Sequence, residues 1–103
     1  MDRLEELKKL QQDDPHDPFL DYAIALELAK RDQRPGAIAR LEELLAKNPD
    51  YLGAYYQLGQ WYEQESRFPE AKNIYTRGIA LAQQKKNQKT LGELRTALDL
   101  LDE

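Results

Sequence analysis

The stretch "LGQWYEQESRFPEA", residues 58–71, decides the fold of this chain. Its first half has the composition of a helix, yet it contains Gly59, and a glycine inside a helix costs about 1 kcal/mol relative to alanine. "ESRF" then interrupts the pattern. Pro69 suits the first turn of a second helix, where the N–H that proline lacks would have no partner. The stretch therefore predicts two helices joined by a short turn. The presence of Gly59 inside the first helix has to be explained, since glycine destabilises a helix.

The same arrangement occurs 34 residues earlier, in "IALELAKRDQRPGA", residues 24–37. Three aligned pairs are small or proline in both copies: Gly59 and Ala25, Pro69 and Pro35, and Ala71 and Ala37. Small residues suit positions where two helices cross closely, and a side chain larger than alanine would hold the helices apart. The offset therefore predicts an internal repeat built from helix pairs.

Apolar positions give each predicted helix one buried face. In the second copy, Tyr55, Leu58, Gly59 and Tyr62 stand at i, i+3, i+4 and i+7, which is a helical stripe. The stripe of the following helix is Ala71, Ile74, Tyr75, Gly78, Ile79 and Ala82. The corresponding stripe in the first copy is Ala37, Ile38, Leu41, Leu44 and Leu45, and "KNPD" ends that helix at residues 47–50. Since no segment alternates with a period of two, we expect an all-α protein without a sheet.

This spacing resembles the tetratricopeptide repeat, a 34-residue helix pair with the pattern W-x₂-L-G-x₂-Y…A-x₃-F…P. The second copy reads Tyr55-x₂-Leu58-Gly59-x₂-Tyr62…Ala71-x₃-Tyr75, with Gln83 where the pattern closes on proline. The first copy reads Asp21-x₂-Ile24-Ala25-x₂-Leu28…Ala37-x₃-Leu41…Pro49. Asp21 occupies the aromatic position, so we expect that helix to begin less firmly packed. The resemblance implies a short right-handed α-solenoid of antiparallel helix pairs, similar to small stand-alone bacterial members of the family.

We expect a single domain, residues 1–103, with two full repeats between capping helices. Its predicted parts are a capping helix and turn at 1–17, repeat 1 at 18–51, repeat 2 at 52–85, and a second capping helix at 86–103. Shifting the alignment by a further 34 residues toward the N-terminus pairs Leu4, Leu7 and Leu10 with Ile38, Leu41 and Leu44. "TLGE", residues 90–93, follows the longer break "KKNQK" and predicts a capping box. The helix that it opens would present Leu91, Leu94, Leu98 and Leu101 to the last repeat.

Composition and charge narrow the class of protein. The net charge is −4 and there is no cysteine, which suits a reducing compartment. Residues 67–95 sum to +5, which leaves −9 for the remainder. Solvated helix faces explain such runs better than a nucleic-acid surface does, because such a surface would also need stacking aromatics close to the lysines. Charge-steered association with another protein is the remaining alternative. The start of the chain lacks a signal-peptide pattern, and no run approaches the roughly 20 apolar residues of a membrane span. We therefore expect a cytoplasmic protein that binds neither nucleic acid nor membrane.

Residues for catalysis or metal binding are few. His16 is the only histidine, in "DDPHDP", and Ser66 is the only serine. A catalytic zinc usually takes more nitrogen or sulfur ligands than this turn offers, and a Ser-His-Asp triad is not expected from two separate loops. Glycine-rich phosphate-binding loops are absent from the sequence. We expect no enzyme, no cofactor and no metal.

The family resemblance implies a concave groove lined by the first helix of each pair, where partners usually bind. The positions that it assigns to the groove are Phe19, Tyr22, Leu26, Ala29 and Lys30 in one repeat and Gly53, Tyr56, Gln57, Gln60, Glu63 and Gln64 in the next. Family members that bind chaperone tails hold a C-terminal carboxylate with lysines and asparagines on this face. Here Tyr22, Leu26, Tyr56 and Gln60 occupy those places with only Lys30 nearby, so we expect no carboxylate clamp.

Two functional hypotheses remain. The first is a non-catalytic interaction module that binds a peptide or helix of a partner protein through Tyr22, Leu26, Tyr56 and Gln60, with tyrosines as anchors. The second is a self-associating structural protein whose homodimer buries the same apolar groove, since a core of this size is small. A further possibility is that the tyrosines only fill space between repeats.

Overall fold

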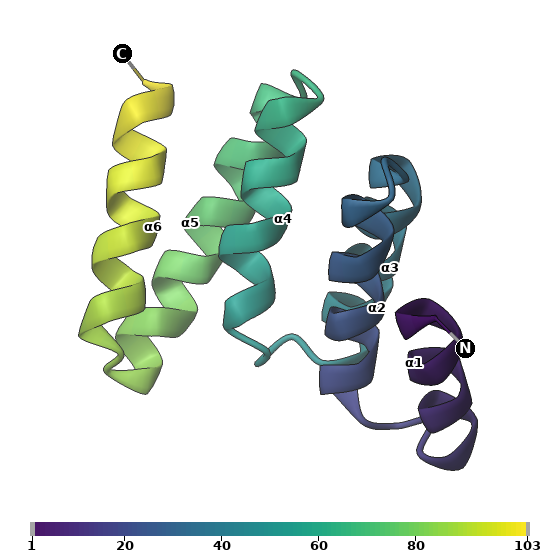
Figure 1. Cartoon of the computed structure of the whole chain (residues 1–103). Coiled ribbons are helices and arrows are strands. Elements are labelled where there is room, and N and C mark those ends of the chain that lie inside the picture. Colours follow the sequence, from purple (N-terminus) through teal and green to yellow (C-terminus); the bar gives the residue numbers. More distant parts are fainter. Residues whose placement is uncertain (1, 103) are drawn as a thin grey trace. The chain divides into compact units, whose positions relative to one another are not determined.

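The computed structural model describes residues 2–102, and its regular elements are all helices. Their bounds are α1 Arg3–Asp13, α2 Pro18–Lys30, α3 Arg34–Lys47, α4 Gly53–Gln64, α5 Phe68–Lys85 and α6 Gln88–Leu101 (Figure 1). Neighbouring helices pack in sequence, α2 on α3, α4 on α5 and α5 on α6. The all-α prediction is confirmed. The chain divides after Pro49 into two compact units, of which the first holds α1–α3 and the second α4–α6.

The turns within the two helix pairs are built alike. Asp32 and Ser66, 34 residues apart, both adopt the left-handed backbone conformation, with φ of 59° and 58°. The next N–H in each turn reaches back five residues, from Gln33 to the Leu28 carbonyl at 3.0 Å and from Arg67 to the Tyr62 carbonyl at 2.8 Å. This hydrogen-bond pattern closes a helix end by supplying donors to its last carbonyls. The predicted breaks "KRDQR" and "ESRF" are thus copies of one turn.

The predicted start of α6 is wrong. The helix begins at Gln88 rather than at Thr90, and Asn87 is its N-cap. The Asn87 side chain accepts a hydrogen bond from the Thr90 N–H at 3.1 Å, so Thr90 lies inside the first turn. Lys86, in the left-handed conformation, ends α5 just before this cap. Asparagine is among the strongest N-capping residues, which explains why it outcompetes the threonine.

Gly59 lies where α4 and α5 cross in the second unit. A Cβ built on it would lie 2.6 Å from Cζ and 2.7 Å from Cδ1 of Tyr75, and closer still to Cε1. Gly78 makes a second close approach, since its Cβ would lie 2.8 Å from the Tyr55 Cβ and 3.0 Å from Leu94 Cδ1 on α6. Real side chains do not approach so closely, so both helix crossings require glycine. The steric limit at Gly59 is stricter than the sequence suggested, because alanine is already too large.

We predict that Gly59→Ala destabilises the protein by about 1–3 kcal/mol, the usual cost of overpacking a core. The matched control is Gly92→Ala in α6, where an added Cβ meets nothing within 4 Å. That change should raise the free energy of unfolding by about 0.5–1 kcal/mol, because alanine favours helix. Urea unfolding measures both effects. Gly59→Ala should cost less in a Tyr75→Leu background, and an equal cost in both backgrounds would contradict the steric explanation.

The core of the first unit joins α1 to α2. Leu7, Leu20, Ala23 and Ile24 are buried together, and Leu4 and Leu28 pack against them. Leu10 departs from the repeat alignment, because its side chain is 51% exposed whereas the aligned Leu44 is fully buried. The helix α1 packs chiefly against α2. The capping helix therefore contributes Leu4 and Leu7 to the core and leaves Leu10 outside it.

Asp21 takes part in a polar cluster where the repeat pattern has an aromatic ring. Its Oδ1 accepts hydrogen bonds from Gln11 Nε2 at 2.7 Å and from the Arg40 guanidinium at 3.3 Å. Arg40 also donates to Gln11 Oε1 at 3.2 Å. Arg40 stands at the position aligned with buried Ile74. The two polar residues that depart from the repeat pattern, Asp21 and Arg40, therefore pair with each other. The cluster links α1, α2 and α3 by hydrogen bonds instead of apolar contact.

A double-mutant cycle between Asp21→Ala and Arg40→Ala should give a coupling energy of about 1 kcal/mol, at the upper end for ion pairs near the surface. The two side chains are only 13% and 27% exposed, which limits screening by water. The comparison pair is Glu43 and Lys47 on α3, which are well exposed and 3.8 Å apart. Its coupling should stay below about 0.5 kcal/mol. Equal couplings would show that the cluster around Asp21 contributes no more than an ordinary surface pair.

Candidate functional site

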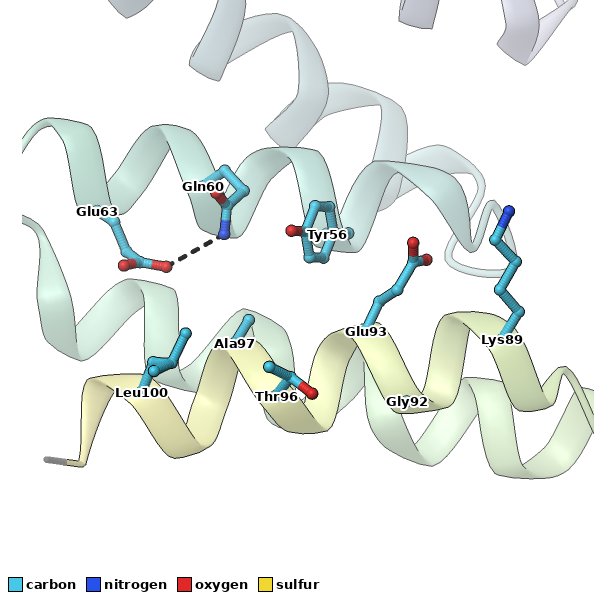
Figure 2. Close-up of a pocket in the computed structure, with 9 residues that line it drawn as sticks. All are labelled: Tyr56, Gln60, Glu63, Lys89, Gly92, Glu93, Thr96, Ala97 and Leu100. Carbon is cyan, nitrogen blue, oxygen red and sulfur yellow. Dashed lines mark hydrogen bonds between the residues drawn. The ribbon is translucent and has the colours of Figure 1, made fainter.

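A cleft of about 560 Å³ lies in the second unit, between α4 and α6. Its lining residues are Tyr56, Gln60 and Glu63 from α4 and Lys89, Gly92, Glu93, Thr96, Ala97 and Leu100 from α6. Figure 2 shows the two rows facing each other, with Tyr56, Gln60 and Glu63 directed toward α6 and Glu93, Ala97 and Leu100 directed back. Lys89 lies at the end of the cleft beyond Glu93, and Glu63 and Leu100 lie at the opposite end (Figure 2). Aromatic, apolar and charged groups thus share one surface.

The sequence of α6 explains why this helix forms the second wall. Leu91, Leu94 and Leu98 have the same spacing as Tyr55, Leu58 and Tyr62 in α4, at an offset of 36. Leu91 and Leu94 are buried and Leu98 is half-buried, so the apolar face points inward as it does in α4. The opposite face must then carry Gly92, Thr96 and Leu100 outward, where α4 carries Tyr56, Gln60 and Gln64. In sequence terms, α6 is the first helix of another pair.

The α6 wall was missed by the sequence reasoning, which assigned this helix only a capping role. The omitted residues are Lys89, Gly92, Glu93, Thr96, Ala97 and Leu100. The signal that could have found them is the offset of 36 described above. The break "KKNQK" before α6 adds two residues, so a search at 34 misaligns this helix.

A buried hydroxyl orders the α4 side of the cleft. The Tyr75 hydroxyl accepts a hydrogen bond from Gln60 Nε2 at 2.6 Å and donates one to Glu63 Oε2. Gln60 Nε2 also donates to Glu63 Oε2 at 3.3 Å (Figure 2). Burial, and then the hydrogen bond to the Glu63 carboxylate, raise the pKa of Tyr75 well above its usual value. Two cleft side chains are therefore held by a residue whose ring already fixes the crossing at Gly59.

We predict that Tyr75→Phe lowers the free energy of unfolding by about 1 kcal/mol at neutral pH, the usual contribution of such hydrogen bonds. Because the folded-state pKa is raised, this contribution is complete below about pH 10, the pKa of tyrosine in the unfolded chain, and declines as the pH rises above it. The difference between Tyr75→Phe and the parent should therefore shrink between about pH 9 and pH 11 in urea unfolding. A difference that stays constant over this range would contradict the raised pKa.

Two charged side chains of the cleft have no partner among residues 2–102. Neither Glu93 nor Lys89 makes a hydrogen bond or an ion pair there, although they stand one helical turn apart. Some cations of the positive segment 67–95, by contrast, are paired. Arg67 pairs with Glu70, and Lys72 lies 2.7 Å from Asp102. Of the two carboxylates in segment 67–95, Glu70 is therefore paired, whereas Glu93 is available to a ligand.

The residues predicted for the groove separate between the two units. Tyr56, Gln60 and Glu63 line the cleft, whereas Gln57 is half-buried on α4 outside its lining. The first-unit residues Phe19, Tyr22, Leu26 and Lys30 all lie on α2. Phe19 and Lys30 are exposed, Leu26 is half-buried, and burial raises the pKa of Tyr22. A role for these four residues stays a prediction.

The turn that carries His16 forms a second hollow, of about 440 Å³. Pro15, His16, Asp21, Lys47 and Asn48 line it. Nowhere in residues 2–102 do three histidine, aspartate or glutamate side chains gather in a group that could hold a metal ion. None of the described helices is both long enough and apolar enough to cross a membrane.

Comparisons with known proteins agree with the geometry. A family model described as "Tetratricopeptide repeat" matches residues 28–98. The solution NMR structure of a tetratricopeptide repeat domain protein from Salinibacter ruber is 43% identical over 85% of this chain and 89% of that one, with a TM-score of 0.82. A crystal structure of a tetratricopeptide repeat domain protein from the same organism is 41% identical over 84% and 97% of the two chains, with a TM-score of 0.79.

A third structure, of a protein from Bordetella parapertussis, has a TM-score of 0.84 over 99% of this chain and 89% of that one. At 22% identity, this likeness concerns the fold alone. The comparison with curated proteins gave no match. Together the matches confirm the family resemblance and the fold that the 34-residue spacing predicted.

Proposed function

Because the chain belongs to the tetratricopeptide repeat family, whose domains generally mediate protein–protein interactions, we propose that it is a non-catalytic interaction module. The partner would place a peptide segment or a helix in the cleft between α4 and α6. The partner-binding residues of the second unit would be Tyr56, Gln60 and Glu63 on α4, facing Glu93, Thr96 and Leu100 on α6.

The observation that carries this proposal is the exposure of large apolar groups inside a recess with fixed polar neighbours. Leu100 is 61% exposed and Tyr56 is 37% exposed, and both line the cleft. Tyrosine is an effective binding anchor because it offers a large rigid surface together with a hydroxyl. Gln60 and Glu63, held by Tyr75, supply polar groups whose side-chain order is already established before a partner arrives.

Self-association is the second candidate, supported by the same exposed side chains. A homodimer that covers Leu100 and Tyr56 would remove apolar surface from water. Light scattering after size-exclusion chromatography separates the candidates, since the monomer mass is 12.0 kDa. A constant monomer mass supports the interaction module with a free cleft. A doubled mass that falls on dilution supports the dimer.

A partner protein is first isolated from a cell lysate by affinity capture on the immobilised chain. We predict that Tyr56→Ala weakens binding to this captured partner about tenfold or more, as expected of an aromatic anchor. Its thermal midpoint should change little, because the ring is partly exposed. The matched control is Phe68→Ala, which removes an exposed aromatic ring of the same unit outside the cleft. Calorimetric titration with the captured partner, after circular dichroism has confirmed the fold, measures both variants.

The outcome that would contradict the proposal is a binding constant that Tyr56→Ala leaves unchanged. A large fall in the midpoint together with a concentration-dependent midpoint would instead favour the dimer, because association stabilises by mass action. An equal loss of affinity for Phe68→Ala would place the binding surface outside the cleft.

A further inference from the structure

We propose that the cleft selects a segment carrying two cationic side chains, lysine or arginine, about 10 Å apart with an apolar side chain between them. This inference rests on the proposed function and specifies the chemistry of the partner. The two cations would face Glu93 and Glu63, and the apolar side chain would lie against Tyr56, Ala97 and Leu100. Three features of the cleft lead to this partner.

The first step concerns Glu93. Its carboxylate has no partner among residues 2–102, even though Lys89 precedes it by four residues in α6. A lysine that precedes a glutamate by four residues is the less favourable order for an ion pair on a helix. Tyr56 and Ala97 lie beside Glu93 in the same recess (Figure 2). An incoming cation would therefore meet an unpaired carboxylate beside an aromatic ring.

The second step concerns Glu63. Its Oε2 accepts hydrogen bonds from the Tyr75 hydroxyl and from the Gln60 amide. Both donors are neutral, so they orient the carboxylate without cancelling its charge. A carboxylate has about four acceptor sites, which leaves room for a cationic donor from a partner. Because the orientation is already fixed, a partner loses less conformational entropy in the protein when it binds.

The third step concerns spacing. Glu63 lies at the level of Leu100, and Leu100 follows Glu93 by seven residues in α6 (Figure 2). Seven residues of helix rise about 10 Å, so Glu93 and Leu100 are separated by roughly that distance along α6, and Glu63 lies toward the Leu100 end of the cleft (Figure 2). A partner helix matches this with basic residues at i and i+7, and a segment in the polyproline II conformation matches it with basic residues at i and i+3, which lie on one face. An acidic segment would meet both carboxylates, with Lys89 alone to attract it.

The probe for this inference is a library of short random peptides displayed on phage and selected on the immobilised full chain. Enriched peptides are then synthesised with a fluorescent label, and their affinities are measured by anisotropy. We expect enrichment of lysine and arginine around apolar residues. Glu93→Lys should weaken binding about tenfold, and Glu93→Gln should weaken it less, because like charges repel where opposite charges attracted. Added salt should weaken binding to the parent chain.

Asp99→Lys is the matched control, because it makes the same charge change on an exposed residue of α6 that does not line the cleft. The affinity of Asp99→Lys for the peptides should stay within about twofold of the parent, because water and salt screen the interaction of a peptide with charges outside the cleft. Circular dichroism confirms that each variant folds.

The inference and the proposed function fail in different ways. If the enriched peptides lack basic residues, or bind Glu93→Lys as well as they bind the parent, while Tyr56→Ala still weakens them, the cationic partner is wrong and the cleft keeps its function. If neither Tyr56→Ala nor Glu93→Lys changes binding, or if the library yields no binder, both proposals are overturned. An equal effect of Asp99→Lys also overturns the inference, because it would show a response to net charge alone.

Discussion

The close approach of α4 and α5 at Gly59 is the constraint on which the second unit depends. The Tyr75 ring occupies the space where a Cβ of residue 59 would stand, so the two helix backbones are held at a fixed crossing. The same ring places its hydroxyl against Gln60 and Glu63, one of which neighbours Gly59 directly in the chain. A residue chosen for packing therefore also orders the side chains of the cleft. Fold and candidate site thus share one residue, whose ring fixes the crossing and whose hydroxyl orders the cleft.

The two units meet the same structural requirement with different residues. The second unit places Gly59 against Tyr75. The aligned residues of the first unit are Ala25, which is larger than glycine, and Leu41, which is smaller than tyrosine, and both are fully buried. Asp21 and Arg40 replace an aromatic and an aliphatic residue, and Gln11 completes their hydrogen bonds. At the crossing position of α6, the offset of 36 places Arg95, an exposed and bulky residue. Helix-pair architecture thus tolerates exchange of residues only in matched sets.

The helix pairs could be predicted from the sequence because their signals are local: apolar stripes, turn residues and small residues at a fixed offset. The groove implied by the family resemblance joined α2 to α4, and a cleft between α4 and α6 was not predicted. Tyr56, Gln60 and Glu63 follow from the repeat, but the α6 wall depends on which face of that helix is buried, and two additional residues before it hide the register. Asn87 was overlooked as the cap because the choice between Asn87 and Thr90 depends on where α5 ends, at the left-handed Lys86. The polar partners of Asp21 come from two other helices, and no pattern within α2 reveals them.

The charge of a binding surface follows from which groups remain unpaired, and residue counts along the chain do not show this. Residues 67–95 carry an excess of positive charge, but some of these cations already have partners. Arg67 donates a hydrogen bond to the Glu70 carboxylate, which lowers the pKa of Glu70. The guanidinium of Arg77 lies 5.7 Å from the ring centre of Tyr55. Glu93 belongs to the same positive segment and is unpaired among residues 2–102. A partner that approaches the cleft meets this carboxylate and that of Glu63, whose hydrogen-bond donors are uncharged, and Lys89 lies at one end. The two glutamates and one lysine that line the recess therefore carry a net negative charge, opposite in sign to the net charge of segment 67–95.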